Sequence, residues 1–251
     1  MDALRRENKR PTLLLHACCA PCSSAVLERL TAAFDVTVLF YNPNIAPEAE
    51  YEKRAAELAR LIREMPAAQG VQMVCAPYDA KEFLDAVRGL EQVPEGGERC
   101  FVCYRLRLEA AARYAKANGF DYFTTTLSIS PLKNAAKLNE IGEALAAQYG
   151  VAHLPADFKK KEGYKRSIEL SRAYGLYRQD FCGCVFSKRE RMKKEMCIRD
   201  SLYRIFFASE SMSPKQYLMQ VRINAAKKML LSGAYTVGET ALSCGFSDAS
   251  Y

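Results

Sequence analysis

The chain contains 251 residues, 49% of them hydrophobic, and carries a formal net charge of +7. A chain of this size can bury the core of one large domain or two smaller ones. It holds no run of about 18 apolar residues, which excludes a membrane-spanning helix. The positive charge permits a polyanionic partner such as RNA without requiring one. The apolar stretch 11–15, which follows the charged residues 1–6, is too short for a signal-peptide core, so we expect a cytoplasmic protein.

Short apolar runs alternate with longer helical patterns over the first three quarters of the chain. The sequence predicts strands at 12–15, 36–41, 71–75, 122–125 and 151–153. It predicts helices between them at 23–33, 48–65, 80–90, 104–118 and 132–149. This alternation is typical of an α/β fold, here a Rossmann-like parallel sheet with helices on both faces. Ligands of such folds lie at the carboxyl ends of the strands. After about residue 195 only helix is predicted, which gives an all-α C-terminal segment.

Seven of the ten cysteines fall into three tight clusters, and these are the strongest functional signal. They are Cys18, Cys19 and Cys22, then Cys100 and Cys103, then Cys182 and Cys184. Thiols in the cytosol are kept reduced, so clustering there indicates metal binding or redox catalysis rather than structural disulfides. The first cluster directly follows the first predicted strand, where a ligand of an α/β fold is expected.

The pair Cys100-x-x-Cys103 provides half of a four-thiolate site, because two intervening residues let both sulfurs approach one centre. Its other half is the adjacent pair Cys18-Cys19. An iron–sulfur cluster tolerates the adjacent spacing, whereas structural zinc, the alternative, is usually held by two C-x-x-C units. A helix predicted from Tyr104 would place its N-terminal amides near the sulfurs.

The third cluster, Cys182-Gly183-Cys184, differs from the other two. One intervening residue makes any disulfide ring strained, which suits a pair that cycles between oxidised and reduced states. The alternatives are two further metal ligands or two ordinary thiols.

Cys75 and the two histidines lie outside the three cysteine clusters, and the sequence assigns none of them a definite role in catalysis. Cys75 is expected to be buried as a packing residue. His16 is either a proton or hydrogen-bond donor near Cys18 or a core histidine, and His153 has no identifiable partner.

The clusters and the segments around them resemble the cobalamin-independent epoxyqueuosine reductases. The resemblance covers about residues 11–195. It rests on the segments 14–22, 40–45 with Glu50, Tyr51 and Arg54, 100–107, 124–131 and 177–187. Leu132 departs from the pattern, in which tyrosine is expected.

The resemblance implies an oxidoreductase that reduces epoxyqueuosine to queuosine in tRNA, the last step of queuosine biosynthesis. It implies a [4Fe–4S] cluster held by Cys18, Cys19, Cys100 and Cys103, and a redox-active disulfide between Cys182 and Cys184. Some members carry an additional mononuclear iron, for which Cys22 and Asp180 are the candidate ligands here. The electron donor is not identified.

The tRNA substrate would present its modified base from the anticodon loop, where bases can be splayed out. The basic residues at 159–161 and 165–166, with Arg105 and Arg107, are candidates for phosphate contacts. A merely solvated charged face is the alternative for each of them.

Residues 202–251 resemble something unrelated, the DNA-binding domain of AraC-type transcription regulators. The matching segments are 202–207, 213–231 and 236–251. The resemblance covers the first helix-turn-helix unit without its opening helices and only part of the second. A reading helix needs a supporting helix to hold it in the groove, so we expect no sequence-specific DNA binding.

The joint between the two resemblances is residues 196–201, Met-Cys-Ile-Arg-Asp-Ser. This hexapeptide is encoded by ATGTGTATAAGAGACAG plus one base, the mosaic end of a transposase used to prepare sequencing libraries. We hypothesise three parts: a reductase-like domain at 1–195, an adapter-derived junction at 196–201, and a regulator fragment at 202–251, joined in sequence assembly. A genuine fusion is the alternative, and a continuous reading frame in the source DNA would establish it.

Two other functions are compatible with parts of the sequence. One is a zinc-stabilised RNA- or nucleotide-binding module without redox chemistry. The other is a redox-sensing transcription regulator, with the cysteines as sensor and the C-terminal helices as DNA reader.

Overall fold

A computed structural model describes residues 10–247, and it contains one five-stranded parallel sheet. The order across the sheet is β3-β2-β1-β4-β5. The strands are β1 (Thr12–His16), β2 (Asp35–Phe40), β3 (Gln72–Cys75), β4 (Tyr122–Thr125) and β5 (Ala152–His153). The predicted parallel α/β sheet is confirmed. The predictions for residues 1–6 and for the last part of the second helix-turn-helix unit, 248–251, lie outside the described residues.

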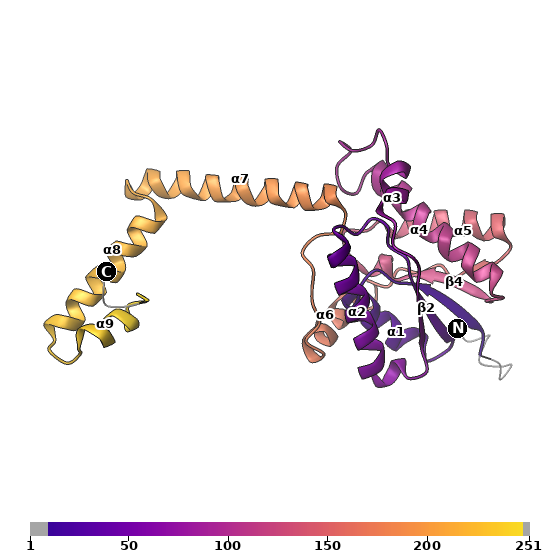
Figure 1. Cartoon of the computed structure of the whole chain (residues 1–251), viewed down its shortest axis with the longest axis horizontal. Helices are drawn as coiled ribbons and strands as arrows, with labels where there is room; N and C mark the ends of the chain where they lie inside the picture. The colour runs from indigo at the N-terminus through magenta and orange to yellow at the C-terminus, as the bar shows by residue number, and fades with distance from the viewer. Residues whose placement is uncertain (1–9, 248–251) are drawn as a thin grey trace. The chain divides into compact units, whose positions relative to one another are not determined.

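Helices pack on both faces of this sheet, as predicted (Figure 1). Leu13 and Leu15 of β1 point to one face and Leu14 to the other, because successive side chains of a strand alternate. The first face is covered mainly by α1 (Ala20–Leu30) and α2 (Glu48–Glu64), with α6 (Gly163–Ala173) against α1. The second face is covered by α4 (Glu98–Ala117) and α5 (Ala135–Tyr149).

The sheet has its topological switch point between β1 and β4. From β1 the chain moves outward through β2 and β3, then crosses back to β4 on the other side of β1. The loops after β1 and β4 therefore diverge to opposite faces and leave a crevice at their carboxyl ends. This is the general ligand-binding position of open parallel sheets. It is also where Cys18 and Cys19 lie, directly after β1.

Two helices begin earlier than the sequence predicts, and both carry cysteines. Helix α1 begins at Ala20 rather than Ser23, because Pro21 fits the first turn, where no N–H is needed. Helix α4 begins at Glu98 rather than Tyr104, with Gly97 at its N-cap and Glu98 favourable in the first turn. The prediction that Cys100 and Cys103 precede the helix is therefore wrong: they lie three residues apart on one helix face.

Three further differences concern single segments. Helix α6 was not predicted. A short helix, α3 (Ala80–Ala86), ends four residues before the prediction. Cys75 is exposed, not buried as predicted, because it ends β3, the edge strand of the sheet. Two short 3₁₀ helices, η2 (Pro66–Ala68) and η3 (Thr126–Ile129), complete the part of the chain before residue 185.

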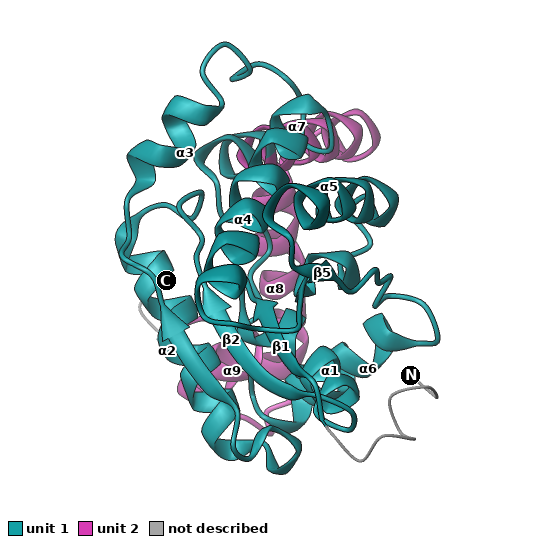
Figure 2. Cartoon of the chain, turned by 90° about the vertical axis from the view of Figure 1, so that its right-hand side faces the viewer, with its two compact units in different colours: residues 1–190 teal, residues 191–251 magenta. Residues whose placement is uncertain are grey.

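The chain divides into two compact units between Glu190 and Arg191 (Figure 2). Helix α7 (Val185–Glu210) runs through this boundary, and α8 (Pro214–Leu231) and α9 (Val237–Ser243) follow, so the predicted all-α segment is confirmed. Helices α8 and α9 each begin with a complete capping box. Of the described residues from 191 onward, however, only Thr240 is buried. The second unit thus has locally stabilised helices but almost no core.

In the part of the chain that the structure describes, no helix is both long and apolar enough to cross a membrane.

Ending the chain at Glu195 is expected to leave the stability of the α/β unit unchanged, within about 0.5 kcal/mol. The reason is that the removed segment supplies no buried apolar side chain among its described residues. Urea unfolding followed by near-ultraviolet circular dichroism would measure this on the long and short chains. A midpoint clearly lower for the short chain would contradict the expectation.

Candidate metal and redox centre

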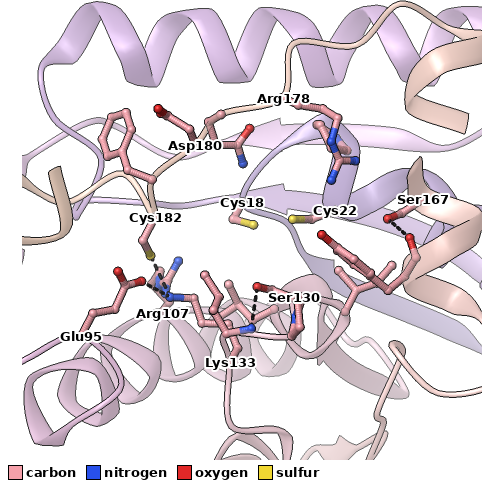
Figure 3. A pocket seen from close by; sticks show the side chains of 18 residues that line it. Cys18, Cys22, Glu95, Arg107, Ser130, Lys133, Ser167, Arg178, Asp180 and Cys182 are labelled. Atoms are coloured by element: carbon pink, nitrogen blue, oxygen red, sulfur yellow. Dashed lines mark hydrogen bonds and ion pairs between the residues drawn. The ribbon is translucent and has the colours of Figure 1, made fainter. Parts of the chain in front are cut away.

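The first cysteine cluster forms a compact group of three thiols at the switch point. The sulfurs of Cys18, Cys19 and Cys22 all lie within 4.8 Å of one another, and those of Cys18 and Cys19 are 3.8 Å apart. Cys18 also approaches the loop after β4, with its sulfur 3.9 Å from Thr126 Oγ1. Figure 3 shows the sulfurs of Cys18 and Cys22 side by side at the wall of a pocket. Cys22, the candidate ligand of an additional iron, therefore belongs to this group.

Within this group, Cys18 is the thiol best prepared to act as a ligand. Hydrogen bonding with the thiols of Cys19 and Cys22 lowers the pKa of Cys18 well below its usual value, and the nearby Arg107 charge adds to this against the effect of burial. Burial raises the pKa of Cys19 to about 12. Because a metal binds the thiolate, the group combines one favoured thiolate with two thiols that metal binding must deprotonate.

The second cluster lies on the first two turns of α4. The backbone N–H of Gly96 donates a hydrogen bond to the Cys100 sulfur at 3.2 Å. Burial raises the pKa of Cys103 to about 12 and also raises that of Cys100. Cys100 and Cys103 line a small hollow together with Cys182 and Cys184. The second and third clusters, distant in sequence, are therefore neighbours.

The four predicted cluster ligands thus come to the same edge of the sheet from two elements. In the described chain, only the triad of Cys18, Cys19 and Cys22 brings three ligand atoms within 4.8 Å. Cys100 and Cys103 belong to the adjoining hollow instead. Arg107 lies between the two groups, since it lines both the hollow and the pocket beside Cys18.

In the third cluster, Cys182 and Cys184 are free thiols with different surroundings. Lys133 Nζ donates a hydrogen bond to the Cys182 sulfur at 3.0 Å and pairs with Glu95 at 3.2 Å. The Cys184 sulfur accepts a hydrogen bond from the backbone N–H of Ser187 at 3.3 Å and is buried. Only Cys182 of the two lines the larger pocket.

Lys133 is a buried cation, with 8% of its surface exposed. Burial alone would lower its pKa. The electrostatic influence of Cys182, Tyr104 and Glu95, with the hydrogen bond to Cys182, outweighs burial, and the pKa of Lys133 lies well above its usual value. The ammonium group therefore keeps its proton next to the Cys182 sulfur.

A side chain of α2 fixes the backbone around the third-cluster cysteines by hydrogen bonds. Arg54, 1% exposed, donates hydrogen bonds to the carbonyl of Cys182 at 3.1 Å and of Phe181 at 3.5 Å, and pairs with Glu50 at 2.7 Å. Gly183 has a φ of +120°, which side chains rarely adopt. A Cβ there would lie 2.9 Å from Ile45 Cγ1 and 3.1 Å from Arg54 Nη1. The loop is thus fixed in a shape that only glycine fits.

A pocket of about 200 Å³ opens beside these groups (Figure 3). Its sulfur-bearing wall contains Cys18, Cys22 and Cys182. Its polar lining includes Glu95, Arg107, Lys133, Arg178, Gln179 and Asp180. Its apolar lining includes Leu127, Ile129 and Phe181. A mostly apolar cavity with a few convergent polar groups is the usual form of a small-ligand site.

His16 is a core residue, and His153 is half-buried. His16 is fully buried, and its ring nitrogens lie 2.9 Å from Thr125 Oγ1 and 3.0 Å from the Tyr41 carbonyl. Burial, with Arg107 nearby, lowers the pKa of His16 to about 4, so the ring is neutral and braces β1 against β4. His153 packs against Phe123, and burial lowers its pKa to about 4 as well.

Most of the basic residues predicted to contact phosphates are engaged within the chain. Lys159 pairs with Asp157 at 2.8 Å, and Arg166 pairs with Glu28 at 2.7 Å. Arg107 is 1% exposed beside the cysteines, so its predicted place on a phosphate-binding surface is wrong.

Several buried polar atoms around the second and third clusters have no hydrogen-bond partner among the residues that the structure describes. They are the amide atoms of Asn44, the hydroxyl of Tyr104 and Nη2 of Arg107. Unpaired buried groups of this kind cost free energy, which indicates a polar group that binds there. Donors beside clustered thiols suit an iron–sulfur cluster, whose sulfurs accept hydrogen bonds. The residues present therefore fit the implied group.

Sequence reasoning missed the contributions of Lys133, Arg54 and Asn44 to this centre. All three stand inside or beside segments of the resemblance. A single sequence does not reveal, however, which lysine, arginine or asparagine becomes buried against a sulfur.

Fold and site together define a cysteine-rich α/β protein with a group of three thiols at its switch point that could hold a metal ion. A family model described as epoxyqueuosine reductase QueH matches residues 13–190. A protein of that name from Streptococcus pyogenes serotype M1 is 46% identical over 186 residues, covering 73% of each chain. The protein of that name from Staphylococcus epidermidis is 43% identical, and the match covers 72% of this chain and 78% of that protein. The one from Thermotoga maritima is 36% identical, and the match covers 73% of this chain and 93% of that protein.

The chain therefore belongs to the epoxyqueuosine reductase QueH family, as the resemblance predicted, and is an oxidoreductase. A second model, a helix-turn-helix domain, matches residues 196–251. The predicted joining of two unrelated families in one chain is thus confirmed. The second match begins six residues before the predicted start of the regulator fragment.

Proposed function

We propose that residues 13–190 reduce epoxyqueuosine to queuosine in tRNA. The observation that carries this proposal is the pocket beside Cys18, Cys22 and Cys182, at the switch point of a chain that belongs to the QueH family. A base splayed out of the anticodon loop is a ligand that such a pocket can receive. We place the reaction in the cytoplasm, where tRNA is abundant and free thiols persist.

The reaction removes the epoxide oxygen as water and leaves an alkene, which requires two electrons and two protons. A dithiol supplies both: the thiols of Cys182 and Cys184 form a disulfide as the epoxide becomes the alkene and water. Both cysteines are free in the structure, and only Cys182 lines the pocket. An external reductant then restores the dithiol.

We assign the [4Fe–4S] cluster to Cys18, Cys19, Cys100 and Cys103. When bound, it supplies single-electron transfer between the cysteine pair and the substrate. For an additional iron we assign Cys22, which adjoins the proposed cluster ligands, and Asp180, which lines the same pocket. The orphaned donors of Asn44, Tyr104 and Arg107 support a group that accepts hydrogen bonds at this place.

Proton delivery is the role we assign to Lys133. Its Nζ holds a proton 3.0 Å from the Cys182 sulfur and lines the pocket. It passes that proton to the departing epoxide oxygen and recovers one from Cys182 as the disulfide forms. Phe181, Leu127 and Ile129 exclude water from the same space.

We further propose that residues 196–251 take no part in this reaction and bind no operator sequence. The near-absence of buried side chains among their described residues supports this. We keep the division into 1–195, 196–201 and 202–251, with the middle segment derived from a sequencing adapter.

Single-cysteine variants separate the proposed ligands from the proposed redox pair. After anaerobic reconstitution with iron and sulfide, Cys18→Ser and Cys103→Ser are expected to lose most bound iron and all measurable reduction of epoxyqueuosine-tRNA. Cys182→Ser and Cys184→Ser should keep about four irons per chain and lose the reduction of epoxyqueuosine-tRNA, because the dithiol supplies its electrons. Cys75→Ser, at an exposed thiol, is the matched control and should resemble the unmodified chain.

Iron retained at full occupancy in Cys18→Ser or Cys103→Ser would overturn the ligand assignment. A colourless protein that retains zinc instead would favour a structural metal site without redox chemistry.

A further inference from the structure

We propose that Asn44, Tyr104 and Arg107 donate hydrogen bonds to the sulfur atoms of the iron–sulfur cluster and raise its reduction potential. This inference rests on the proposed function, because it requires that the cysteine centre hold a cluster. It assigns a role to three side chains that neither ligate metal nor form the redox pair.

The first observation is a set of buried polar atoms without partners. Three buried donors, Nδ2 of Asn44, the Tyr104 hydroxyl and Nη2 of Arg107, have no hydrogen-bond partner among the described residues, and the Asn44 amide oxygen has none either. Each of the three residues is 1% exposed. Buried donors are paired in almost all folded proteins, so several orphans in one place indicate a missing acceptor.

The second observation is that the three residues converge on the cysteines. Asn44, Tyr104 and Arg107 all line the hollow formed by Cys100, Cys103, Cys182 and Cys184. This hollow is only about 10 Å³, about the limit for one water molecule, so water cannot serve all the orphaned atoms. Arg107 and Cys182 also line the adjoining pocket of about 200 Å³, which offers room for a larger group.

The third observation is that the chain fixes Arg107 so that one nitrogen is left for a ligand. Its Nε donates to the Cys103 carbonyl at 3.3 Å, and its Nη1 donates to Asn42 Oδ1 at 3.4 Å. The Asn42 amide is itself anchored, since Nδ2 donates to the Ala17 carbonyl at 2.8 Å. Nη2 alone remains, and the side chain lies between the Cys18 group and the hollow.

The third of these donors, Tyr104, is a neutral one. Its buried phenol hydroxyl has a proton that it can donate. An acceptor that suits an amide, a hydroxyl and a guanidinium at once is a concentrated negative charge. Cluster sulfides and their thiolate ligands provide one, and hydrogen bonds to them stabilise the reduced, more negative state.

The test uses the full chain, reconstituted anaerobically with iron and sulfide, and measures iron content and midpoint potential by a titration followed with electron paramagnetic resonance. Arg107→Met is expected to keep its iron and shift the one-electron reduction equilibrium about tenfold toward the oxidised state, which is about 59 mV. Arg107→Lys should restore part of the shift. Tyr104→Phe, which removes only a hydroxyl, should shift the equilibrium about threefold in the same direction. Tyr149→Phe is the control, because its hydroxyl contacts Glu109 elsewhere.

If the unmodified chain binds no iron, the proposed function and this inference both fail. If it binds the cluster and Tyr104→Phe keeps both its iron and an unchanged potential, this inference alone is overturned, whether or not Arg107→Met folds. A raised KM for tRNA at an unchanged potential would likewise overturn it, since the donors would then face the substrate.

Discussion

Lys133→Met is expected to reduce the turnover of epoxyqueuosine-tRNA by about 100-fold or more, the range lost with a general acid. The affinity for tRNA should change little. The substitution keeps the length and apolar stem of the side chain but removes the proton that Nζ holds 3.0 Å from the Cys182 sulfur. Single-turnover assays of nucleoside composition, with tRNA binding measured separately, would resolve the two effects.

Two variants make this result specific. Lys133→Arg keeps a positive charge with a different shape, and we expect it to recover part of the activity. Lys137→Met, at a half-buried lysine whose ion pair with Glu140 lies at 2.5 Å, should keep full activity. A Lys133→Met variant with normal turnover would contradict the assignment of Lys133 as the proton donor.

The pH dependence follows from the raised pKa of Lys133. A lysine whose pKa lies above its usual value keeps its proton through the neutral and mildly alkaline range. Turnover should therefore show no loss from Lys133 deprotonation between about pH 7 and pH 9.

Arg54→Met is expected to lower the free energy of unfolding by about 3–5 kcal/mol, the usual cost of removing one partner from a buried ion pair. Arg54 is 1% exposed and Glu50 is largely buried, so no water replaces the lost guanidinium. The carbonyls of Phe181 and Cys182 also lose their donor. Urea unfolding of the α/β unit would measure the loss.

The same variant should loosen the loop that carries the redox pair. We expect Cys182 and Cys184 to form their disulfide more slowly when the reduced chain is oxidised, because Gly183 loses a fixed neighbour. Arg60→Met is the matched control on the same helix. Its ion pairs with Glu57 and Glu64 are partly exposed, so the expected cost is about 0–1 kcal/mol. Equal losses for the two variants would contradict the special role of Arg54.

The sheet was predictable because its strands carry a local signal. Short apolar runs such as 12–15 and 122–125 alternate with amphipathic helices, and this pattern alone predicts a parallel sheet. The helix beginnings were less predictable, since they depend on cap residues. Because of Pro21 and Gly97, α1 and α4 begin earlier than the sequence predicts, so Cys22 and Cys100 lie within the first turns of these helices.

The cysteine clusters were visible in the sequence, but their surroundings were not. Spacing along the chain shows that Cys100 and Cys103 can share a centre. It does not show that Cys182 lies beside them, or that Lys133 donates to its sulfur. These contacts join segments about 50 to 80 residues apart. They arise from the crossover of the chain at the switch point, which only the assembled sheet defines.

In the second unit, the sequence predicts the helices correctly but does not show whether they pack into a domain. Its helices form from local signals, as the capping boxes at Ser213 and Thr236 show. Helix formation of this kind does not require a core, and almost none is present among the described residues. A family match and regular helices therefore do not establish a working DNA-binding domain here.

The central claim is that this cysteine centre reduces epoxyqueuosine in tRNA. The most direct test reconstitutes the full chain anaerobically with iron and sulfide, adds reductant and epoxyqueuosine-tRNA, and measures nucleosides by mass spectrometry. The account predicts conversion to queuosine by protein holding about four irons per chain. Iron-loaded, folded protein that leaves epoxyqueuosine unchanged would contradict it.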